Sequence, residues 1–482
     1  MMKATSIFGG VQVFNILISV IRSKLIAVLL GPAGMGIAGL LTSTAGLITS
    51  LTNFGLSTSA VKDIATAAAS GNQTRIAIVF KVFKRLTWIT GLLGLLVTLI
   101  LSPWLSQITF GNKAYTIAFA CISVTLLLGQ LSGGQMILLQ GMRKLQLLAK
   151  ANIAGSILGL IVTVPLYYFM GVRGIVPAII IAAVSTLALS FYFSNKLEVK
   201  NIRVSAIRTI AEGKSMLYMG FMISLSGLMT MGASYLVRIY ISNTGGVADV
   251  GLYNAGFSII ITYVGMIFTA MGTDYYPRLA AVANNNTESS KVINQQAEIA
   301  VLIIAPVILV FLVYINWVIV LMYSTKFVPV NQMILYAAFG MFFKAVSWAI
   351  AFIFLAKGAK KLYFWNELIT NIYLLLFNII GYKFWGLTGL GVSFMLAYVL
   401  YMIQVFAIAK LKYKFAFEAA FYKIFAIQLS LAVACFLTVK LTASPYSYIA
   451  GTIIVLFSCA CSFIELDKRL GIKSILTSLK AK

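Results

Sequence analysis

Histidine is absent from this 482-residue chain, and acidic residues are scarce, with only 11 Asp and Glu against 37 Lys and Arg. Without histidine, the chain lacks the side chain that most often binds metals and transfers protons near neutral pH. The few acids form no D-x-D motif, and neither a P-loop nor a G-x-S-x-G nucleophile motif occurs. These absences argue against an ATPase, a hydrolase and, more broadly, an enzyme. We expect no cofactor and no metal site.

Charge of either sign is also too rare for a soluble protein. Only 10% of the residues are charged, 61% are hydrophobic and the mean hydropathy is +0.98, whereas soluble domains contain about 25% charged residues. The surface of such a chain must face lipid. The sequence therefore predicts an all-α polytopic membrane protein.

The long apolar segments set the expected number of spans. A helix needs roughly 20 apolar residues to cross the hydrocarbon core of a bilayer. We expect 14 transmembrane helices at about 7–30, 36–58, 86–106, 115–139, 151–171, 174–194, 215–241, 250–273, 297–320, 331–355, 362–382, 386–409, 423–441 and 446–464.

The net charge of +26 has a topological explanation. Connections between the expected spans alternate between nearly uncharged and basic, and about 28 of the 37 basic residues fall in the basic set against about five in the other. Because cytoplasmic loops collect Lys and Arg, both termini are predicted to be cytoplasmic. Nucleic acid is not an expected partner.

A weak internal repeat divides the chain. Residues 24–40 resemble residues 239–255, and an offset of about 215 places Gly36 on Gly251. Two related bundles of six helices, with a site between them, are typical of secondary transporters. We therefore expect an N-terminal lobe at 1–214, a C-terminal lobe at 215–422, and two additional helices with a basic cytoplasmic tail at 423–482.

Four cations fall inside the expected spans, namely Arg22, Lys24, Arg238 and Lys344. A charge at the bilayer centre costs roughly 2.5–3.5 kcal/mol on insertion scales, so such residues usually face a cavity or a partner. Arg and Lys bind phosphate through charge-assisted hydrogen bonds. The pattern predicts a cationic central cavity that binds an anionic head group.

Two acids near the same spans leave alternatives open. Glu367 lies inside the eleventh expected span and Asp274 at the end of the eighth. Either acid is a candidate for ion coupling. Alternatively, Glu367 forms a salt bridge with Lys344, and Asp274 caps its helix and pairs with Arg278.

Two segments resemble a known family. SKLIAVLLGPAGMGIAGLLTSTAGLITSLTNFGLSTSAVK at 23–62 is similar to the N-terminal region of Wzx-type flippases, which translocate lipid-linked units of O-antigen and enterobacterial common antigen. TDYYPRLA at 273–280 resembles the segment after the eighth span of those proteins. Lys24 stands at the lysine of the family's first-span motif.

The resemblance implies a fold and a substrate. The fold is the MATE-like two-lobed bundle of the MOP exporter superfamily. The substrate is an undecaprenyl-pyrophosphate-linked oligosaccharide, moved to the periplasmic leaflet of a bacterial inner membrane. Expected partners are this substrate and membrane lipids, and a polysaccharide polymerase and a chain-length regulator are candidates.

Two other functions compete with this one. A MATE-type exporter of small drugs usually captures cations, which requires acids rather than bases in its cavity. A membrane-embedded polysaccharide polymerase or ligase usually needs a larger extramembrane site than these short loops provide.

Overall fold

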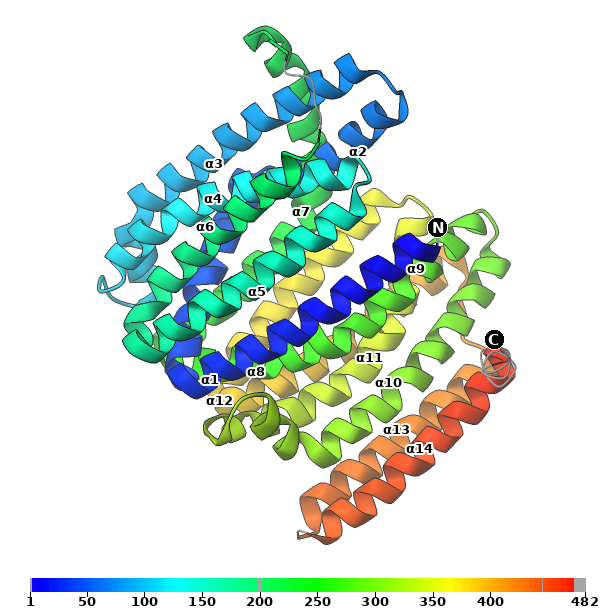
Figure 1. The fold of residues 1–482 in the computed structure, drawn as a ribbon. Coiled ribbons are helices and arrows are strands. Elements are labelled where there is room, and N and C mark those ends of the chain that lie inside the picture. The colour runs from blue at the N-terminus through cyan, green and yellow to red at the C-terminus, as the bar shows by residue number, and fades with distance from the viewer. Residues whose placement is uncertain (1, 198–201, 444, 472–482) are drawn as a thin grey trace. The chain divides into compact units, whose positions relative to one another are not determined.

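The computed structural model describes residues 2–197, 202–443 and 445–471, and within these ranges every regular element is helical (Figure 1). The elements are α1 Met2–Thr52, α2 Leu56–Ala69, α3 Gln73–Phe110, α4 Thr116–Gly141, α5 Leu145–Met170, η1 Gly171–Gly174, α6 Ile175–Ser194, α7 Ala206–Thr244, α8 Val247–Phe257, η2 Ser258–Val264, α9 Gly265–Ala281, α10 Asn286–Met322, η3 Thr325–Val330, α11 Asn331–Ala356, α12 Lys360–Tyr413, α13 Ala419–Leu441 and α14 Tyr446–Leu470.

The described residues contain ten helical segments long and apolar enough to span a membrane, or eleven with the bent helix α7. Three of these segments, 14–52, 145–194 and 360–413, each cover most or all of two predicted spans. The prediction of an all-helical protein with about 14 spans is therefore confirmed, and the chain is a multi-pass membrane protein.

Two predicted connections are kinks within continuous helices. The segment 31–36 was expected as a loop, but α1 runs through it with a break at Gly31, whose φ is 66°. Pro32 follows directly, and its ring is incompatible with a regular helix interior. In α12 the break is at Gly386, with φ 56°. Both glycines occupy backbone conformations that residues with a Cβ rarely adopt.

Helices also extend beyond the predicted spans. The third span was expected from residue 86, yet α3 begins at Gln73, where the Asn72 side chain accepts a hydrogen bond from the backbone N–H of Arg75. The basic segment 81–85 is therefore helical. The short helix α2 was not predicted as a separate helix, because its first residues fall inside the expected span 36–58 and its 14 residues contain no long apolar run.

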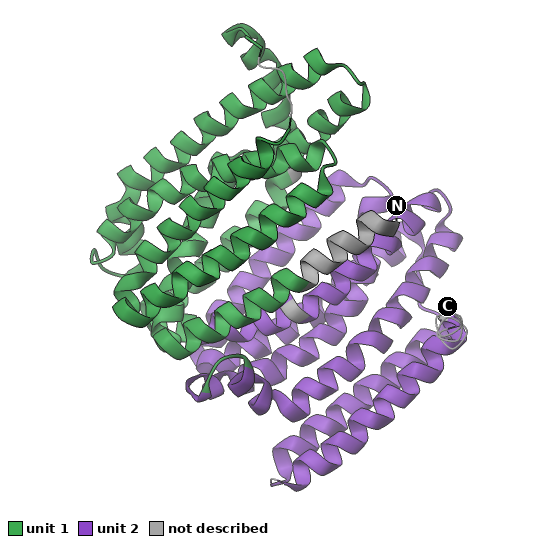
Figure 2. Ribbon diagram, in the orientation of Figure 1, with its two compact units in different colours: residues 1–251, 322–324 green, residues 252–321, 325–482 purple. Residues whose placement is uncertain are grey.

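The chain divides into two compact units (Figure 2). Unit 1 comprises residues 1–251 and 322–324, and unit 2 comprises residues 252–321 and 325–482. The division by contacts thus falls after Gly251. The lobes 1–214 and 215–422 were defined by the sequence repeat, and that division stays a prediction, as does the separate status of 423–482.

In unit 1, α1 packs against α3, α5 and α7, and α4 packs against α3 and α6. The repeat has a direct structural counterpart here. A Cβ on Gly36 would collide with the carbonyl of Val247, and a Cβ on Gly251 would collide with the carbonyl of Pro32. Because 32 and 247 are also 215 positions apart, the two segments meet reciprocally, residue for residue. Only glycine permits so close a backbone approach.

In unit 2, α11 is the central helix. It packs against α9, α12 and α13, and most of its side chains are buried. Helices α13 and α14 are joined by Gln428, which donates to the Ser462 hydroxyl and accepts from Ser458. The hydroxyls of Tyr314 and Thr452 lie 2.7 Å apart and connect α10 to α14. Polar side chains thus hold helices together where lipid supplies no hydrophobic driving force.

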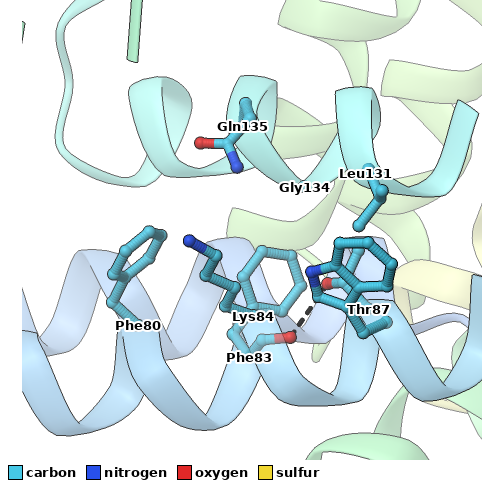
Figure 3. A pocket seen from close by; sticks show the side chains of 8 residues that line it. Phe80, Phe83, Lys84, Thr87, Leu131, Gly134 and Gln135 are labelled. Carbon is cyan, nitrogen blue, oxygen red and sulfur yellow. Dashed lines mark hydrogen bonds between the residues drawn. The ribbon is translucent and has the colours of Figure 1, made fainter. Parts of the chain in front are cut away.

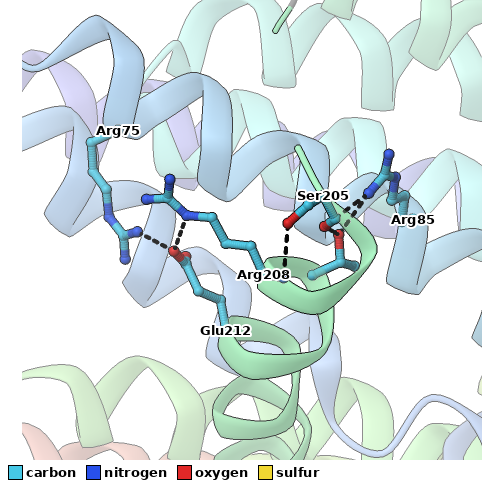
Figure 4. A network of polar contacts seen from close by, with 6 residues as sticks. Arg75, Arg85, Ser205, Arg208 and Glu212 are labelled. Atoms are coloured by element: carbon cyan, nitrogen blue, oxygen red, sulfur yellow. Dashed lines mark hydrogen bonds and ion pairs between the residues drawn. The ribbon is translucent and has the colours of Figure 1, made fainter. Parts of the chain in front are cut away.

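Each unit also contains a three-residue ion network. In unit 1, Glu212 of α7 accepts from Arg75 of α3 at 2.6 Å and from Arg208 at 3.2 Å (Figure 4). Arg85 of α3 donates to the carbonyl of Val204 and the hydroxyl of Thr209, so it binds the segment where α7 begins.

The network of unit 2 has one base between two acids. Arg469 of α14 pairs with Glu298 of α10 at 2.7 Å and with Glu465 at 2.5 Å. The Glu298 side chain is only 7% exposed. This contact fixes the end of α14 against α10.

Candidate functional site

The two cations of α1 precede the Gly31 kink. Arg22 and Lys24 are both half-buried. The Arg22 guanidinium lies near the hydroxyl of Tyr167, a buried residue of α5. A neutral phenol does not neutralise the charge of a guanidinium group. This neighbour therefore leaves the positive charge of Arg22 in place.

The third cation, Arg238, lies half-buried on α7. Its Nη1 donates to the carbonyl of Ser234 at 3.1 Å, one turn earlier on the same helix. This bond lies within α7 itself.

Two polar residues hold α7 on either side of Arg238. The buried hydroxyl of Tyr235 bonds the hydroxyls of Thr44 on α1, at 3.0 Å, and Thr109 on α3, at 2.7 Å. The Asn243 amide donates to the carbonyl of Ile108 at 2.8 Å. Sequence reasoning missed these residues, although polar side chains within apolar spans are a usable signal for contacts between helices.

Lys344 of α11, in unit 2, is surrounded by aromatic rings. Its Nζ lies 5.2 Å from the ring centroid of Tyr398, 5.9 Å from that of Phe394 and 6.0 Å from that of Phe268. Ring faces attract a cation through their quadrupole. They stabilise the ammonium group without neutralising it.

Glu367 belongs to a polar network inside α12. Its Oε1 accepts from the Tyr401 hydroxyl at 3.3 Å, and the Asn366 amide also donates to that hydroxyl. Gln404 donates to Asn366 Oδ1 at 2.8 Å. Among the described residues, no ion pair joins Glu367 to Lys344.

Asp274 pairs with Arg278 at 2.8 Å, which is the charge pairing that the sequence left open as an alternative. Arg278 also donates to Gln296. The Asp274 side chain is 76% exposed, and exposed ion pairs contribute about 0–1 kcal/mol. Asp274 therefore lies on an exposed face within α9, which continues to Ala281, and it does not cap the helix as the sequence alternative expected.

The predicted site residues are thus distributed over both units. Arg22, Lys24 and Arg238 belong to unit 1, where α1 packs against α7, and Lys344, Asp274 and Glu367 belong to unit 2. The grouping of the four cations around one anion stays a prediction.

Two further features do not provide a site. The pocket between α3 and α4 that contains Lys84 and Gln135 (Figure 3) has a volume of about 10 Å³, enough for about one water molecule. Within residues 2–197, 202–443 and 445–471, no three Cys, Asp or Glu side chains gather as a metal site.

Comparison with protein families gives a clear assignment. A family model described as "Polysaccharide biosynthesis protein" matches residues 25–332, which is more than half of the chain. The chain belongs to this polysaccharide biosynthesis family. The matched range includes Arg238, and it begins one residue after Lys24. No curated protein sequence gives a significant match.

Solved structures confirm the predicted fold. An inward-facing multidrug resistance MATE family transporter of the MOP superfamily is 16% identical, with 85% of this chain and 96% of that chain covered and a TM-score of 0.70. The lipid II flippase MurJ is 13% identical, with 96% and 99% covered and the same TM-score.

A MOP superfamily transporter from Pyrococcus furiosus, whose binding pocket is described as having reverse polarity, is 17% identical, with 85% and 94% covered and a TM-score of 0.56. At identities of 13–17%, these similarities establish only the fold of this protein and not its activity. The fold includes both drug exporters and a lipid flippase, so the choice between these activities depends on the chain's own residues.

Proposed function

We propose that this protein is a flippase for undecaprenyl-pyrophosphate-linked O-antigen oligosaccharides. It moves the saccharide head group from the cytoplasmic to the periplasmic leaflet of a bacterial inner membrane, with both of its own termini in the cytoplasm. No bond is made or broken in this process, so the protein is not an enzyme. Family membership supports the polysaccharide pathway, and the fold supports transport.

One observation supports an anionic substrate above all others. Half-buried Arg22, Lys24, Arg238 and Lys344 lie within apolar helices, where a charge is retained only for a partner or a function. The described partners of Arg22 and Lys344 are a phenol and aromatic rings, neither of which neutralises a cation. A pyrophosphate would provide the negative charge that these contacts do not give to Arg22 and Lys344. A cation-exporting drug pump would need the opposite polarity.

Transport follows from alternating exposure of these residues to the two sides of the membrane. The polyprenyl tail remains in lipid while the head group moves. Glu367 is the candidate for coupling to an ion gradient, because its carboxylate accepts from the Tyr401 hydroxyl, which connects it to the amides of Asn366 and Gln404. Such oxygen-rich surroundings suit either a proton or a hard cation.

Complementation tests the proposal. Wild type, Lys24→Ala and Arg238→Ala are expressed in a strain lacking its own O-antigen flippase, and surface polysaccharide is measured at matched abundance in the membrane. A lost charge-assisted hydrogen bond costs about 1.5–3 kcal/mol, so we expect each variant to transport about 10- to 100-fold more slowly. Normal transport by both variants would show that these cations are structural.

If wild type fails to complement, the result does not by itself refute the function, because the sugars of the test strain must match the protein's own substrate. A flipping assay in proteoliposomes with the cognate lipid-linked unit decides the matter. Absence of flipping there would refute the proposed function itself. Glu367→Gln, assayed in the same vesicles with and without an imposed ion gradient, should flip equally in both if Glu367 couples transport to the ion.

A further inference from the structure

A cavity of about 360 Å³ lies in unit 1 where the turn between α1 and α2 meets α7. Its size falls within the usual range of small-molecule sites, about 300–1,000 Å³. Its lining includes no charged residue. The polar side chains that line it are Ser50, Asn53, Ser57, Thr58, Ser224 and Ser226. We call it the hydroxyl cavity.

The cavity is formed by a close crossing of backbones. Gly55, with φ 63°, begins α2 and contacts the carbonyl of Gly220 on α7, where any Cβ at either position would collide. Beyond this crossing, α7 bends by 52° between its segments Ala206–Phe221 and Ser224–Thr244. The bend lies directly before Ser224, so the cavity is a consequence of how α7 passes the α1–α2 turn.

Three polar side chains of the cavity differ from the hydroxyls beside it. Thr52 and Ser59, which flank the turn, donate to carbonyls of their own helices, at 2.9 and 3.2 Å. Within the part of the chain that the structure describes, the side chains of Asn53, Ser57 and Ser224 form no such hydrogen bond. Their donors and acceptors are therefore directed to solvent or to a ligand.

The lining chemistry selects one class of ligand. Hydroxyl and amide groups both donate and accept hydrogen bonds, which matches the hydroxyls of a sugar. A phosphate would need cations, and a polyprenyl chain would leave these polar groups unpaired. The apolar side chains of Leu228 and Met231 complete the lining and suit the C–H face of a sugar ring.

We propose that the hydroxyl cavity is a saccharide subsite that binds neutral sugars of the transported head group, apart from the cations that bind its pyrophosphate. This assignment rests on the proposed function and deepens it, because it names the part of the substrate that each set of residues recognises.

Cysteine protection tests binding directly. In a protein whose cysteines at 121, 435, 459 and 461 are replaced by alanine or serine, Ser57→Cys is labelled with a maleimide in detergent micelles. Undecaprenyl-pyrophosphate-linked oligosaccharide should slow labelling at least about fivefold, whereas inorganic pyrophosphate should not. Equal labelling with and without the oligosaccharide lipid would overturn the subsite, even if wild type flips normally.

A filled cavity tests its use in transport. Gly227 lines the cavity, and a Cβ there would meet no atom within 4 Å. Gly227→Leu should therefore fold normally but flip the oligosaccharide lipid at least about tenfold more slowly. Gly232→Leu is the matched control, because Gly232 lies on the same helix with equally open space but outside the lining.

The outcomes of the second test are distinct. Slow flipping by Gly227→Leu alone supports the subsite. Normal flipping by both variants overturns it and leaves the flippase function intact. Absence of flipping by wild type in the same vesicles counts against the proposed function, whereas the labelling result still decides whether the cavity binds saccharide.

Discussion

The hydroxyl cavity of unit 1 has a counterpart in unit 2 with different chemistry. The offset of 215 that relates Gly36 to Gly251 also places residues 53–58 on residues 268–273. Four of those residues, Phe268, Thr269, Gly272 and Thr273, line a cavity of about 480 Å³ in unit 2, where Phe268 stands in place of Asn53 and Gly272 in place of Ser57. The remaining lining of this aromatic cavity includes Tyr276, Trp348 and Phe352. The two segments differ in backbone as well as in chemistry, because residues 53–55 form the turn before α2 whereas residues 268–273 lie inside the helix α9.

The ion networks of the two units also differ, in the ratio of acidic to basic residues. Unit 1 places one acid between two bases, Arg75–Glu212–Arg208, and unit 2 places one base between two acids, Glu298–Arg469–Glu465. The charges within the apolar helices are divided similarly: three of the four cations lie in unit 1, whereas the acid Glu367 lies in unit 2. We infer a division of labour, with head-group recognition concentrated in unit 1 and ion coupling in unit 2.

Breaking the reciprocal glycine contact should have the largest effect. In Gly36→Val, the new side chain would collide with the backbone carbonyl of Val247, which cannot rotate away. We expect a loss of more than about 3 kcal/mol of folding free energy, at or beyond the upper range for overpacking, and little protein in the membrane. Abundance and thermal unfolding in detergent measure this. The control Gly129→Ala has open space, and a stable Gly36→Val would refute the close approach.

The two ion networks should differ in strength because their burial differs. Arg469→Met leaves Glu298, whose side chain is 7% exposed, without its partner, and breaking a buried pair costs about 3–5 kcal/mol. We expect about 3 kcal/mol, because the Arg469 side chain is itself 21% exposed. Arg75→Met should cost less than about 1 kcal/mol, because Arg75 is 46% exposed and Arg208 still pairs with Glu212. Unfolding temperatures in detergent compare the two, and equal losses would contradict the ranking by burial.

Removing the Tyr235 hydroxyl should have an intermediate effect. Tyr235→Phe deletes the bonds to Thr44 and Thr109 that join α7 to α1 and α3, and interhelical hydrogen bonds within membranes contribute on average about 0.6 and at most about 1.7 kcal/mol. We expect a stability loss of about 1 kcal/mol and slower flipping, since the turn that bears Arg238 is less firmly held. Tyr401→Phe is the counterpart in unit 2 and should affect stability equally. Unchanged stability of Tyr235→Phe would show that packing alone positions α7.

The sequence predicted the helices and the repeat because both depend on local patterns. Apolar runs of about 20 residues identify spans wherever they occur, and the Gly36–Gly251 correspondence was visible as similarity between two segments. The sequence did not predict α2, whose 14 residues contain no long apolar run, or the helical extension of α3 to Gln73.

The contacts that shape the site were beyond sequence reasoning for a different reason. Glu212 is 137 residues from Arg75, and Glu298 is 171 residues from Arg469, so no local pattern connects the partners. Serine and threonine are common throughout the apolar segments, and only the crossing of Gly55 with Gly220 makes six of the polar side chains line one cavity. Embedded charges were detectable one by one, but their partners were not.

The smallest expected effect concerns Asp63 of α2, beside the network of unit 1. Burial raises the pKa of this carboxyl above its ordinary value of 3.8, against the attraction of Lys62 and Arg75, and the negative charge of Glu212 adds to the rise. A folded-state pKa above the unfolded one means that the folded protein holds the proton more tightly. Stability is then lost as pH rises through the interval between the two values.

Asp63→Asn removes this loss, so the variant should be slightly more stable than wild type at pH 7 and equal to it below about pH 2.5, where the acid is protonated in both states. Unfolding temperatures of both proteins in the same detergent at the two pH values measure the difference. Because Asp63 is only half-buried, the gain should be smaller than any loss predicted above. If the variant is less stable than wild type at pH 7, the attraction between Arg75 and the Asp63 carboxylate outweighs the cost of burying that carboxylate. The excess of positive charge in unit 1 would then stabilise its half-buried acids as well.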